Sequence, residues 1–548
     1  MMFLRQASAN LLKRFRFCPQ SLQRSSPILL SNAGKCRFSS ELGSGGYFSD
    51  SSQWIFLFGP AAVILGVNAS PALAEELSTP ATTGIDGVDV EISGLRKIED
   101  GSIVSNIHTS KWRVFTDSGR DLFLQGKLEE AEKLFLSALR EAKEGFGDRD
   151  PHVASAYNNL AELYRVKKAF DKAEPMYLEA IIILEESFGQ EDVRVAAALH
   201  NLGQFYLMQR KLEQARGVYE RALKIKRRVL GEAHPDYADT MYHLGTVLYL
   251  QGKYKDSEAL IRDSIRILED GGQGESMMCT KRMRHLAEIY IKSDRIEEAE
   301  NVLRKILHIM ELAKGWKSLE TVIAAERLAL TLQSLGNLKE AQELLERCLD
   351  ARRALLPENH IQIAANLLHL ARVKMLDPNK LKKTAANQVR AELDMAKDLL
   401  SKSISVARKN LVPSVKEKGS KQPYGESMTT VRSRQSALII LLQSFDALSL
   451  LEMKKLELED SKDRYSSEAE NALRGCISAY KEFVTEKSLS DAPGVKAEYI
   501  LCLKHLVDLL TDNKTSSKDR SSNAALQELK DEIKRVQVDL SKKGGRRS

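Results

Sequence analysis

Small side chains recur every 42 residues along the middle of the chain, in two series that keep the same phase. The first series holds Ala or Ser at Ala131, Ala173, Ala215, Ser257, Ala299 and Ala341. The second holds Gly or Ala at Gly119, Ala161, Gly203, Gly245, Ala287, Ala329 and Ala371. A fixed period of this length indicates one supersecondary unit copied in tandem. The two series therefore constrain the fold more tightly than composition does.

Each copy predicts two helices. The segment HVASAYNNLAELYRVKKAF is followed by DKAEPMYLEAIIILEESFG, and both carry apolar residues at helical i, i+3, i+4 spacing. A small residue at a fixed point lets two helix backbones approach closely, and larger apolar residues fill the remaining space. These larger positions are Leu160, Leu202, Leu244, Leu286, Leu328 and Leu370, then Phe135, Tyr177, Tyr219, Ile261, Leu303 and Leu345. No copy can bury its own apolar face, so neighbouring copies must stack into an all-α solenoid.

The connections between helices agree with this pattern. Gly126, Gly252 and Gly336 fall between the first and second helix of their copies, where a left-handed backbone favours Gly. Pro151 and Pro235 are 42 residues apart and suit the first turn of a helix. The sequence thus predicts where each helix of the pair begins and ends.

The motifs NNLAELY, HNLGQFY and YHLGTVLY resemble the tetratricopeptide repeat (TPR), in the 42-residue form found in kinesin light chain and nephrocystin-type proteins. The resemblance covers residues 111–376, as six repeats and a partial seventh. It implies a right-handed TPR superhelix that binds partner proteins along the concave side, which the first helix of each pair lines. It does not imply a motor role, because the coiled coil that precedes the repeats in light chains is missing from residues 75–110.

Polar residues of the first helices form the candidate peptide-binding groove. An Asn side chain offers both a donor and an acceptor to an extended peptide, and Tyr adds flat apolar area. An alternative is that these side chains only solvate a surface. A chaperone-type carboxylate clamp is not expected, because Glu162 and Asp239 would repel a carboxylate. The candidates are Asn158, Asn159, Glu162, His200, Asn201, Gln204, Tyr242, His243, Arg284, His285, Arg327 and His369.

The formal net charge of +7 arises at the extreme N-terminus. Residues 1–40 carry seven basic residues and no acid, so basic and acidic residues balance in the rest of the chain. An Arg- and Ser-rich, acid-free segment with apolar residues on one face is typical of an organelle transit peptide. The segment Arg37-Phe38-Ser39-Ser40 resembles a plant-type mitochondrial processing site. We expect a mitochondrial protein, with the chloroplast as the alternative, and residues 41–53 as a linker.

Residues 54–74 are mostly apolar but interrupted by Gly59 and Pro60. One interpretation is a membrane anchor, although a spanning helix needs about 20 apolar residues. A second is a sorting signal cut after Ala72-Leu73-Ala74, which would release the protein into the intermembrane space or the thylakoid lumen. A third is an apolar segment buried against the solenoid. Residues 75–110 are expected to be a flexible linker.

The strict period stops after Leu376, and residues 377–548 predict a further helical region. Helical patterns occupy residues 384–410, 464–487, 496–511 and 523–540, and a loop is expected at 410–425 because Pro and Gly cluster there. The segment SALIILLQSFDALSLLEMKKLELE predicts a buried helix that is too interrupted to span a membrane. A degenerate repeat around residues 431–487 would cap the stack.

No catalytic signature is present. The chain lacks the phosphate-binding, dinucleotide-binding and HExxH patterns, so we expect no enzyme activity, cofactor or small-molecule substrate. No metal site is expected, because His243, His285 and His369 share one register and stacked repeats hold such residues about 10 Å apart. The six cysteines form no motif, and Cys348 replaces a core Ala as a packing residue.

These observations predict a non-enzymatic adaptor that binds other proteins in an organelle and serves complex assembly. The rival hypothesis is an organellar RNA-processing factor, since helical repeats also bind RNA. The balanced charge of residues 41–548 argues against a nucleic-acid partner. A third hypothesis is a structural oligomer that associates through the C-terminal helices.

Overall fold

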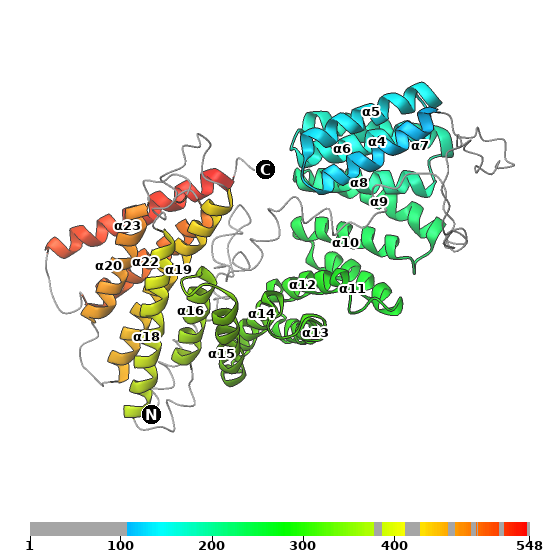
Figure 1. The fold of residues 1–548 in the computed structure, drawn as a ribbon. Helices are drawn as coiled ribbons and strands as arrows, with labels where there is room; N and C mark the ends of the chain where they lie inside the picture. The colour runs from blue at the N-terminus through cyan, green and yellow to red at the C-terminus, as the bar shows by residue number, and fades with distance from the viewer. Residues whose placement is uncertain are drawn as a thin grey trace, which may run out of the picture. The chain divides into compact units, whose positions relative to one another are not determined.

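The computed structural model describes residues 107–376, 386–411, 428–458, 466–483, 489, 492–513 and 520–544. The predicted transit peptide, the apolar segment 54–74 and most of the linker 75–110 lie outside these ranges. Within them the chain forms eighteen helices and no strand (Figure 1). The prediction of an all-α fold built from helical pairs is confirmed.

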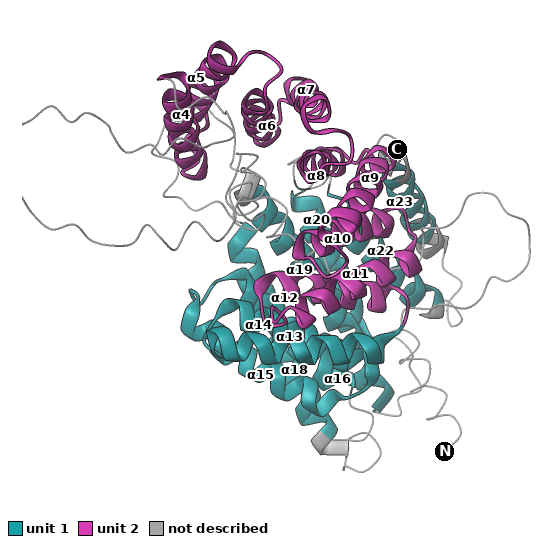
Figure 2. Ribbon diagram, turned by 90° about the vertical axis from the view of Figure 1, so that its right-hand side faces the viewer, with its two compact units in different colours: residues 1–43, 295–548 teal, residues 44–294 magenta. Residues whose placement is uncertain are grey.

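The described helices fall into two compact units that divide between Asp294 and Arg295, coloured separately in Figure 2. In the N-terminal unit, consecutive helices pack against one another as antiparallel neighbours joined by short turns. Its helices are α4 (Ile107–Leu124), α5 (Leu128–Phe146), α6 (Pro151–Val166), α7 (Phe170–Phe188), α8 (Val193–Met208), α9 (Leu212–Leu230), α10 (Pro235–Leu250), α11 (Tyr254–Asp270) and α12 (Met277–Lys292).

The C-terminal unit continues the same sequential packing of neighbouring helices. Its helices are α13 (Ile296–Lys314), α14 (Leu319–Leu335), α15 (Leu338–Leu355), α16 (Ile361–Leu376), α18 (Ala386–Leu411), α19 (Met428–Leu458), α20 (Ser467–Phe483), α22 (Pro493–Asn513) and α23 (Arg520–Gly544). The helices expected beyond Leu376 are therefore present. The loop expected at 410–425 lies mostly outside the described residues.

All thirteen positions of the two small-residue series are buried, as are both larger apolar series. The contact between a small residue and a large residue of the paired helix is clearest where the small residue is Gly. A Cβ atom on Gly119 would lie 2.8 Å from the Phe135 ring, and one on Gly203 would lie 2.7 Å from the Tyr219 ring. In both cases the large residue follows the small one by 16 positions in the neighbouring helix. The period in the sequence is thus a repeated contact between paired helices.

The turn inside each pair uses a left-handed residue at the same 42-residue step. The predicted Gly126, Gly252 and Gly336 have φ of 78°, 81° and 86°. In the intervening copies the same position holds a side chain that rarely adopts this conformation: Lys168, Arg210 and Asp294, with φ of 59°, 64° and 61°. The backbone of the repeat therefore imposes the turn even where the residue does not favour it.

A further series with the same 42-residue step caps the first helices and was not predicted from the sequence. In each case a side chain at the N-cap accepts a hydrogen bond from a backbone N–H in the first turn. The capping residues differ in type and share only the step of 42 residues. They are Asp150, Asp192, His234, Ser276 and Ser318.

Helix α19 is the centre of the C-terminal core. Leu438, Leu441 and Leu451 are buried there among residues of α16, α18, α20 and α22. Among the described helices, Val431–Leu458 of α19 is the one that is long and apolar enough to cross a membrane, with a mean hydropathy of 1.5 over its most apolar window. Because 67% of that window is buried inside the protein, the helix also meets the description of a core helix.

Candidate functional site

The structure places the twelve predicted groove residues deeper than expected. Seven are buried and the other five are half-buried, so the expectation that these side chains lie outside the core is wrong for the seven. The cause is the close stacking of first helices, in which a side chain on one helix is covered by the next. The buried set is Asn158, Asn159, His200, Asn201, Tyr242, His243 and His369, and the half-buried set is Glu162, Gln204, Arg284, His285 and Arg327.

The asparagines interact with each other across neighbouring repeats. Asn201 of α8 donates from Nδ2 to Oδ1 of Asn158 of α6, at 3.1 Å. Asn159 differs, because its buried Nδ2 has no hydrogen-bond partner among the described residues. Part of the predicted peptide-binding amide set therefore holds two repeats together, and one amide donor is left for a further partner.

Glu162 takes part in a buried network at the centre of the second repeat. Arg165 donates from Nη2 to Oε2 of Glu162 at 2.6 Å, and the hydroxyl of Tyr177 donates to the other carboxylate oxygen. Burial raises the pKa of Tyr177 well above its usual value, and the Glu162 charge adds to this effect. The network therefore keeps Tyr177 protonated and fixes the orientation of the carboxylate.

His200, Asp239 and His243 converge between α8 and α10. Nε2 of His200 lies 3.5 Å from Oδ2 of Asp239, and Nε2 of His243 lies 3.8 Å from the same oxygen. The two imidazole rings have centroids 5.1 Å apart and meet edge to face. His243, His285 and His369 share one register of the repeat, whereas His200 precedes Asn201, the residue equivalent to His243. The predicted wide separation concerns residues of one register and does not cover His200 and His243.

Basic residues surround this cluster. Arg282 of α12 donates from Nη2 to Oδ1 of Asp239 at 3.1 Å, and the buried Lys226 of α9 donates from Nζ to the backbone oxygen of Asp236. Burial alone would raise the pKa of Asp239, but His243, His200 and Arg282 together lower it to about 2. Burial lowers the pKa of His243 to about 4. At neutral pH the carboxylate is charged and His243 is neutral.

Two of the predicted residues, Arg327 and His369, belong to the C-terminal unit. There Arg352 forms a bidentate pair with Glu326, with both N–O distances at 2.7 Å, and also donates to Asn366 at 3.0 Å. His369 is buried, its Nδ1 has no hydrogen-bond partner among the described residues, and burial lowers its pKa to about 4. The Glu326–Arg352 pair holds α14 to α15 and is a structural element of the core.

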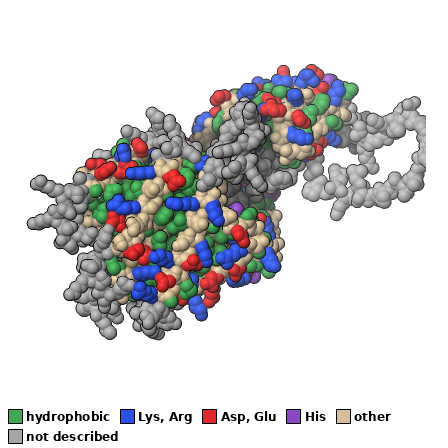
Figure 3. Space-filling view, turned by 60° about the vertical axis from the view of Figure 1, so that its left-hand side comes forward, with side chains coloured by type: hydrophobic (Ala, Val, Ile, Leu, Met, Phe, Trp, Pro, Cys, Tyr) green, Lys and Arg blue, Asp and Glu red, His purple; other side chains and the backbone are tan. Residues whose placement is uncertain are grey.

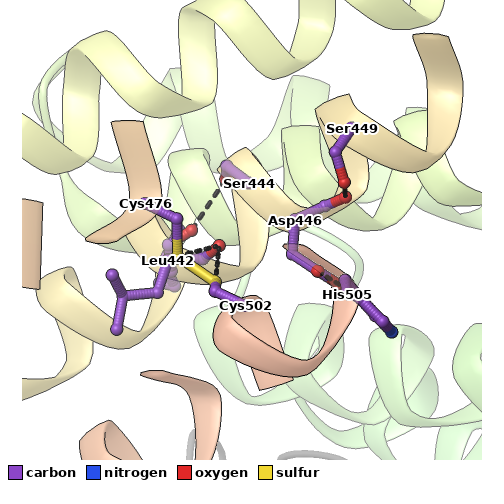
Figure 4. The surroundings of a disulfide bond; sticks show 8 residues. Leu442, Ser444, Asp446, Ser449, Cys476, Cys502 and His505 are labelled. Atoms are coloured by element: carbon purple, nitrogen blue, oxygen red, sulfur yellow. Dashed lines mark hydrogen bonds and ion pairs between the residues drawn. A yellow bond between two sulfur atoms is a disulfide. The ribbon is translucent and has the colours of Figure 1, made fainter. Parts of the chain in front are cut away.

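The cysteines depart from expectation at one point. Cys476 of α20 and Cys502 of α22 form a disulfide, although they are 26 residues apart in the sequence (Figure 4). Both sulfur atoms lie near the backbone oxygen of Leu442 in α19, at 3.7 and 3.8 Å. Cys348 is a buried free thiol, which confirms its packing role.

The surface charge is mixed. Figure 3 shows basic and acidic side chains interspersed over the described parts of one face. Basic side chains that lie inward, such as Lys226 and Arg282, are buried. This distribution agrees with the balanced charge of the chain after residue 40.

Comparison with known proteins gives the family of the repeats. Residues 113–186, 194–270 and 277–354 match the family model described as tetratricopeptide repeat. No curated protein sequence matches the chain.

Several solved structures are similar to this chain. A kinesin light chain-like protein of nearly identical TPR-like repeats from Podosopora anserina is 20% identical, with a TM-score of 0.35 over 37% of this chain and 97% of that one. The apo form of RapI is 12% identical, with a TM-score of 0.49 over 80% and 99%. BtubC from P. vanneervenii is 16% identical, with a TM-score of 0.26 over 59% and 97%. Together with the family model, the paired helices identify residues 113–354 as consecutive tetratricopeptide repeats.

Proposed function

We propose that this chain is a non-enzymatic adaptor of an organelle, which binds a segment of a partner protein along the first helices of its repeats. TPR repeats generally mediate protein–protein interaction, and proteins built from them are generally non-enzymatic scaffolds. The observation that carries the proposal is the array of six repeats matching the TPR model, whose first helices carry a series of polar side chains. A natural role for such an adaptor is the assembly of an organelle complex.

The half-buried residues are the better candidates for direct contact with a partner. Glu162, Gln204, Arg284, His285 and Arg327 retain solvent access, whereas the buried members of the set support the helices beneath them. Asn159 adds a buried amide donor without a hydrogen-bond partner in the described part of the chain. Buried polar groups are costly when unpaired, so a ligand that accepts from this amide would gain affinity.

Two features support an oxidising compartment of an organelle. Residues 1–40 have the composition of a transit peptide. The Cys476–Cys502 disulfide is of the kind that persists where thiols are not kept reduced. Among the alternatives that the leader leaves open, these features favour the mitochondrial intermembrane space, or the thylakoid lumen if the organelle is a chloroplast.

Proximity labelling from a C-terminal fusion in intact organelles tests the proposal. We expect labelled proteins of one organelle compartment, and loss of the main partner in the variant Arg284→Glu. The matched control is Lys224→Glu, the same charge reversal at an exposed position of α9. Recovery of cytosolic proteins alone would refute the organelle assignment, and equal labelling by both variants would refute the role of the first helices. Firm retention on heparin at moderate salt would favour RNA binding instead.

A further inference from the structure

The cluster of His200, Asp239 and His243 has the composition and spacing of a metal site. Each residue offers one ligand atom, and these three atoms all lie within 4.8 Å of one another. A tetrahedral ion with bonds of about 2.0–2.1 Å holds its ligand atoms about 3.4 Å apart. The two distances to Oδ2 of Asp239, 3.5 and 3.8 Å, are close to that value. The distance between the two histidine nitrogens is bounded at 4.8 Å, so the three atoms would draw closer together on binding one ion.

The helices make this arrangement rigid. Asp239 and His243 are separated by four residues on α10, which places both on one face of the helix. His200 comes from α8 in the preceding repeat. All three belong to the N-terminal unit, and both histidines are buried. Two ligands from one helix and a third from its neighbour would join successive repeats.

The hydrogen bonds around the cluster orient the ligand atoms. Nδ1 of His200 lies 3.1 Å from the hydroxyl oxygen of Thr240, and that hydroxyl donates to the backbone oxygen of Asp236. The hydroxyl therefore accepts from Nδ1–H, which leaves the Nε2 lone pair directed at the cluster. Gln204 donates from its side-chain Nε2 to that same nitrogen at 2.8 Å, so an ion bound at Nε2 of His200 would replace this hydrogen bond. Arg282 binds Oδ1 of Asp239 and leaves Oδ2 for an ion.

The charges around the cluster select among metals. Calcium and magnesium depend on several oxygen ligands, and the nearby Arg282 and Lys226 oppose an ion held by charge alone. Imidazole nitrogens suit zinc and its neighbours in the transition series.

We propose that His200, Asp239 and His243 bind a divalent transition-metal ion of the zinc type, which ties α8 to α10 and leaves a fourth position for water. The site adjoins Gln204, one of the half-buried residues that the adaptor function uses. It would stiffen the third and fourth repeats, since the ion replaces weaker contacts between their first helices.

Titration of the purified, chelator-treated full chain with Co²⁺ tests this site by visible absorption. We expect one equivalent to give the intense bands of a four-coordinate ion, and Zn²⁺ to abolish them. The variants His200→Gln, His243→Gln and Asp239→Asn should each weaken binding at least tenfold, and circular dichroism should show unchanged helix content. The matched control, His285→Gln, removes another inward histidine and should leave the titration unchanged.

Zinc should also raise the thermal midpoint of the wild-type chain and leave that of His243→Gln unchanged, because an ion stabilises only the state that binds it. Absence of four-coordinate bands from the wild-type chain would overturn the proposal, whatever the variants do. Bands that persist in both histidine variants would also overturn it. They would assign the ion to another group, such as His108, Glu141 and Glu144.

Discussion

The close contact between Gly203 and Tyr219 can be tested with one added methyl group. A Cβ atom at position 203 would lie 2.7 Å from two carbon atoms of the Tyr219 ring and 2.9 Å from a third. Carbon atoms in contact prefer about 3.5–4.0 Å, so the ring or the helix must move by about 1 Å. The ring has little freedom, because Tyr219 is fully buried, stacks on His243 and meets the edge of His200.

Overpacking of this kind costs about 1–3 kcal/mol. Replacing Gly by Ala within a helix returns about 1 kcal/mol, because Ala has the higher helix propensity. Gly203→Ala should therefore be neutral to about 2 kcal/mol less stable than the wild-type protein. The gain from propensity is the same wherever the helix is straight, which makes a second glycine a useful reference.

Gly217 provides that reference. It lies on α9 in the same repeat, is exposed, and has no atom within 4 Å of an added Cβ. Gly217→Ala should stabilise the protein by about 1 kcal/mol. Since the propensity and unfolded-chain effects cancel between the two variants, their difference measures the overpacking alone, at about 1–3 kcal/mol. Thermal unfolding would report this as about 2–4 °C for each kcal/mol.

Equal stabilisation of both variants would refute the reasoning, because it would show that the helices are not as close at position 203 as the 42-residue series implies. Ala161 makes the comparison stringent. It occupies the same register opposite Tyr177, so the repeat can accept Ala where the surrounding residues are different. The prediction concerns the particular ring packing of Tyr219 with the two histidines.

Three further predictions follow from single features of the structure. Arg210→Gly should raise stability by about 0.5–1 kcal/mol because it relieves a left-handed backbone, whereas Arg210→Ala keeps the Cβ and should give no such gain in a urea titration. Reduction of the Cys476–Cys502 bond should destabilise the C-terminal unit by about 3 kcal/mol, and Cys476→Ser should make the protein insensitive to dithiothreitol. Burial acts to raise the pKa of Glu326, but the positive charge of Arg352 has the larger effect and the pKa is lowered from 4.5. The Glu326–Arg352 pair should therefore stabilise the protein above pH 4.5, and this stabilisation should be lost as the pH falls further. Glu326→Gln should flatten this pH dependence of stability.

The repeat could be predicted because one contact is made many times. All thirteen small residues are buried, and at Gly119, Gly203 and Gly245 a large side chain of the paired helix lies where a Cβ atom would be, so a larger residue there would separate the helices. Selection for this packing therefore leaves small residues at a regular spacing that is visible in the sequence. The capping series could not be predicted, because its members are not of one residue type. Asp192, His234 and Ser276 each cap the N-terminus of a first helix, but they are different residue types. The 42-residue step between them therefore shows no repeated amino acid in the sequence.

The depth of the candidate groove could not be predicted from residue type. Asn, His and Glu usually favour the surface, and the pattern gives no sign that Asn201 pairs with Asn158 or that Glu162 receives Arg165 and Tyr177. The disulfide was missed in a similar way. Cys476 and Cys502 are distant in sequence, and only the packing of α20 and α22 around Leu442 brings them together.

The cluster of His200, Asp239 and His243 shows why a perfect period can hide a site. Comparing equivalent positions assumes that function, like packing, repeats with the same register. Successive first helices instead face each other with an offset, so a residue at one register meets the neighbour's residue at the next. His200 meets His243 in this way, and Asp239 lies one turn before His243 on the same helix. A single substitution at a position next to the equivalent one, such as His200, can therefore create a cluster of ligand atoms between two repeats. The stack of helices is unchanged, because the substitution does not alter the buried core positions on either side.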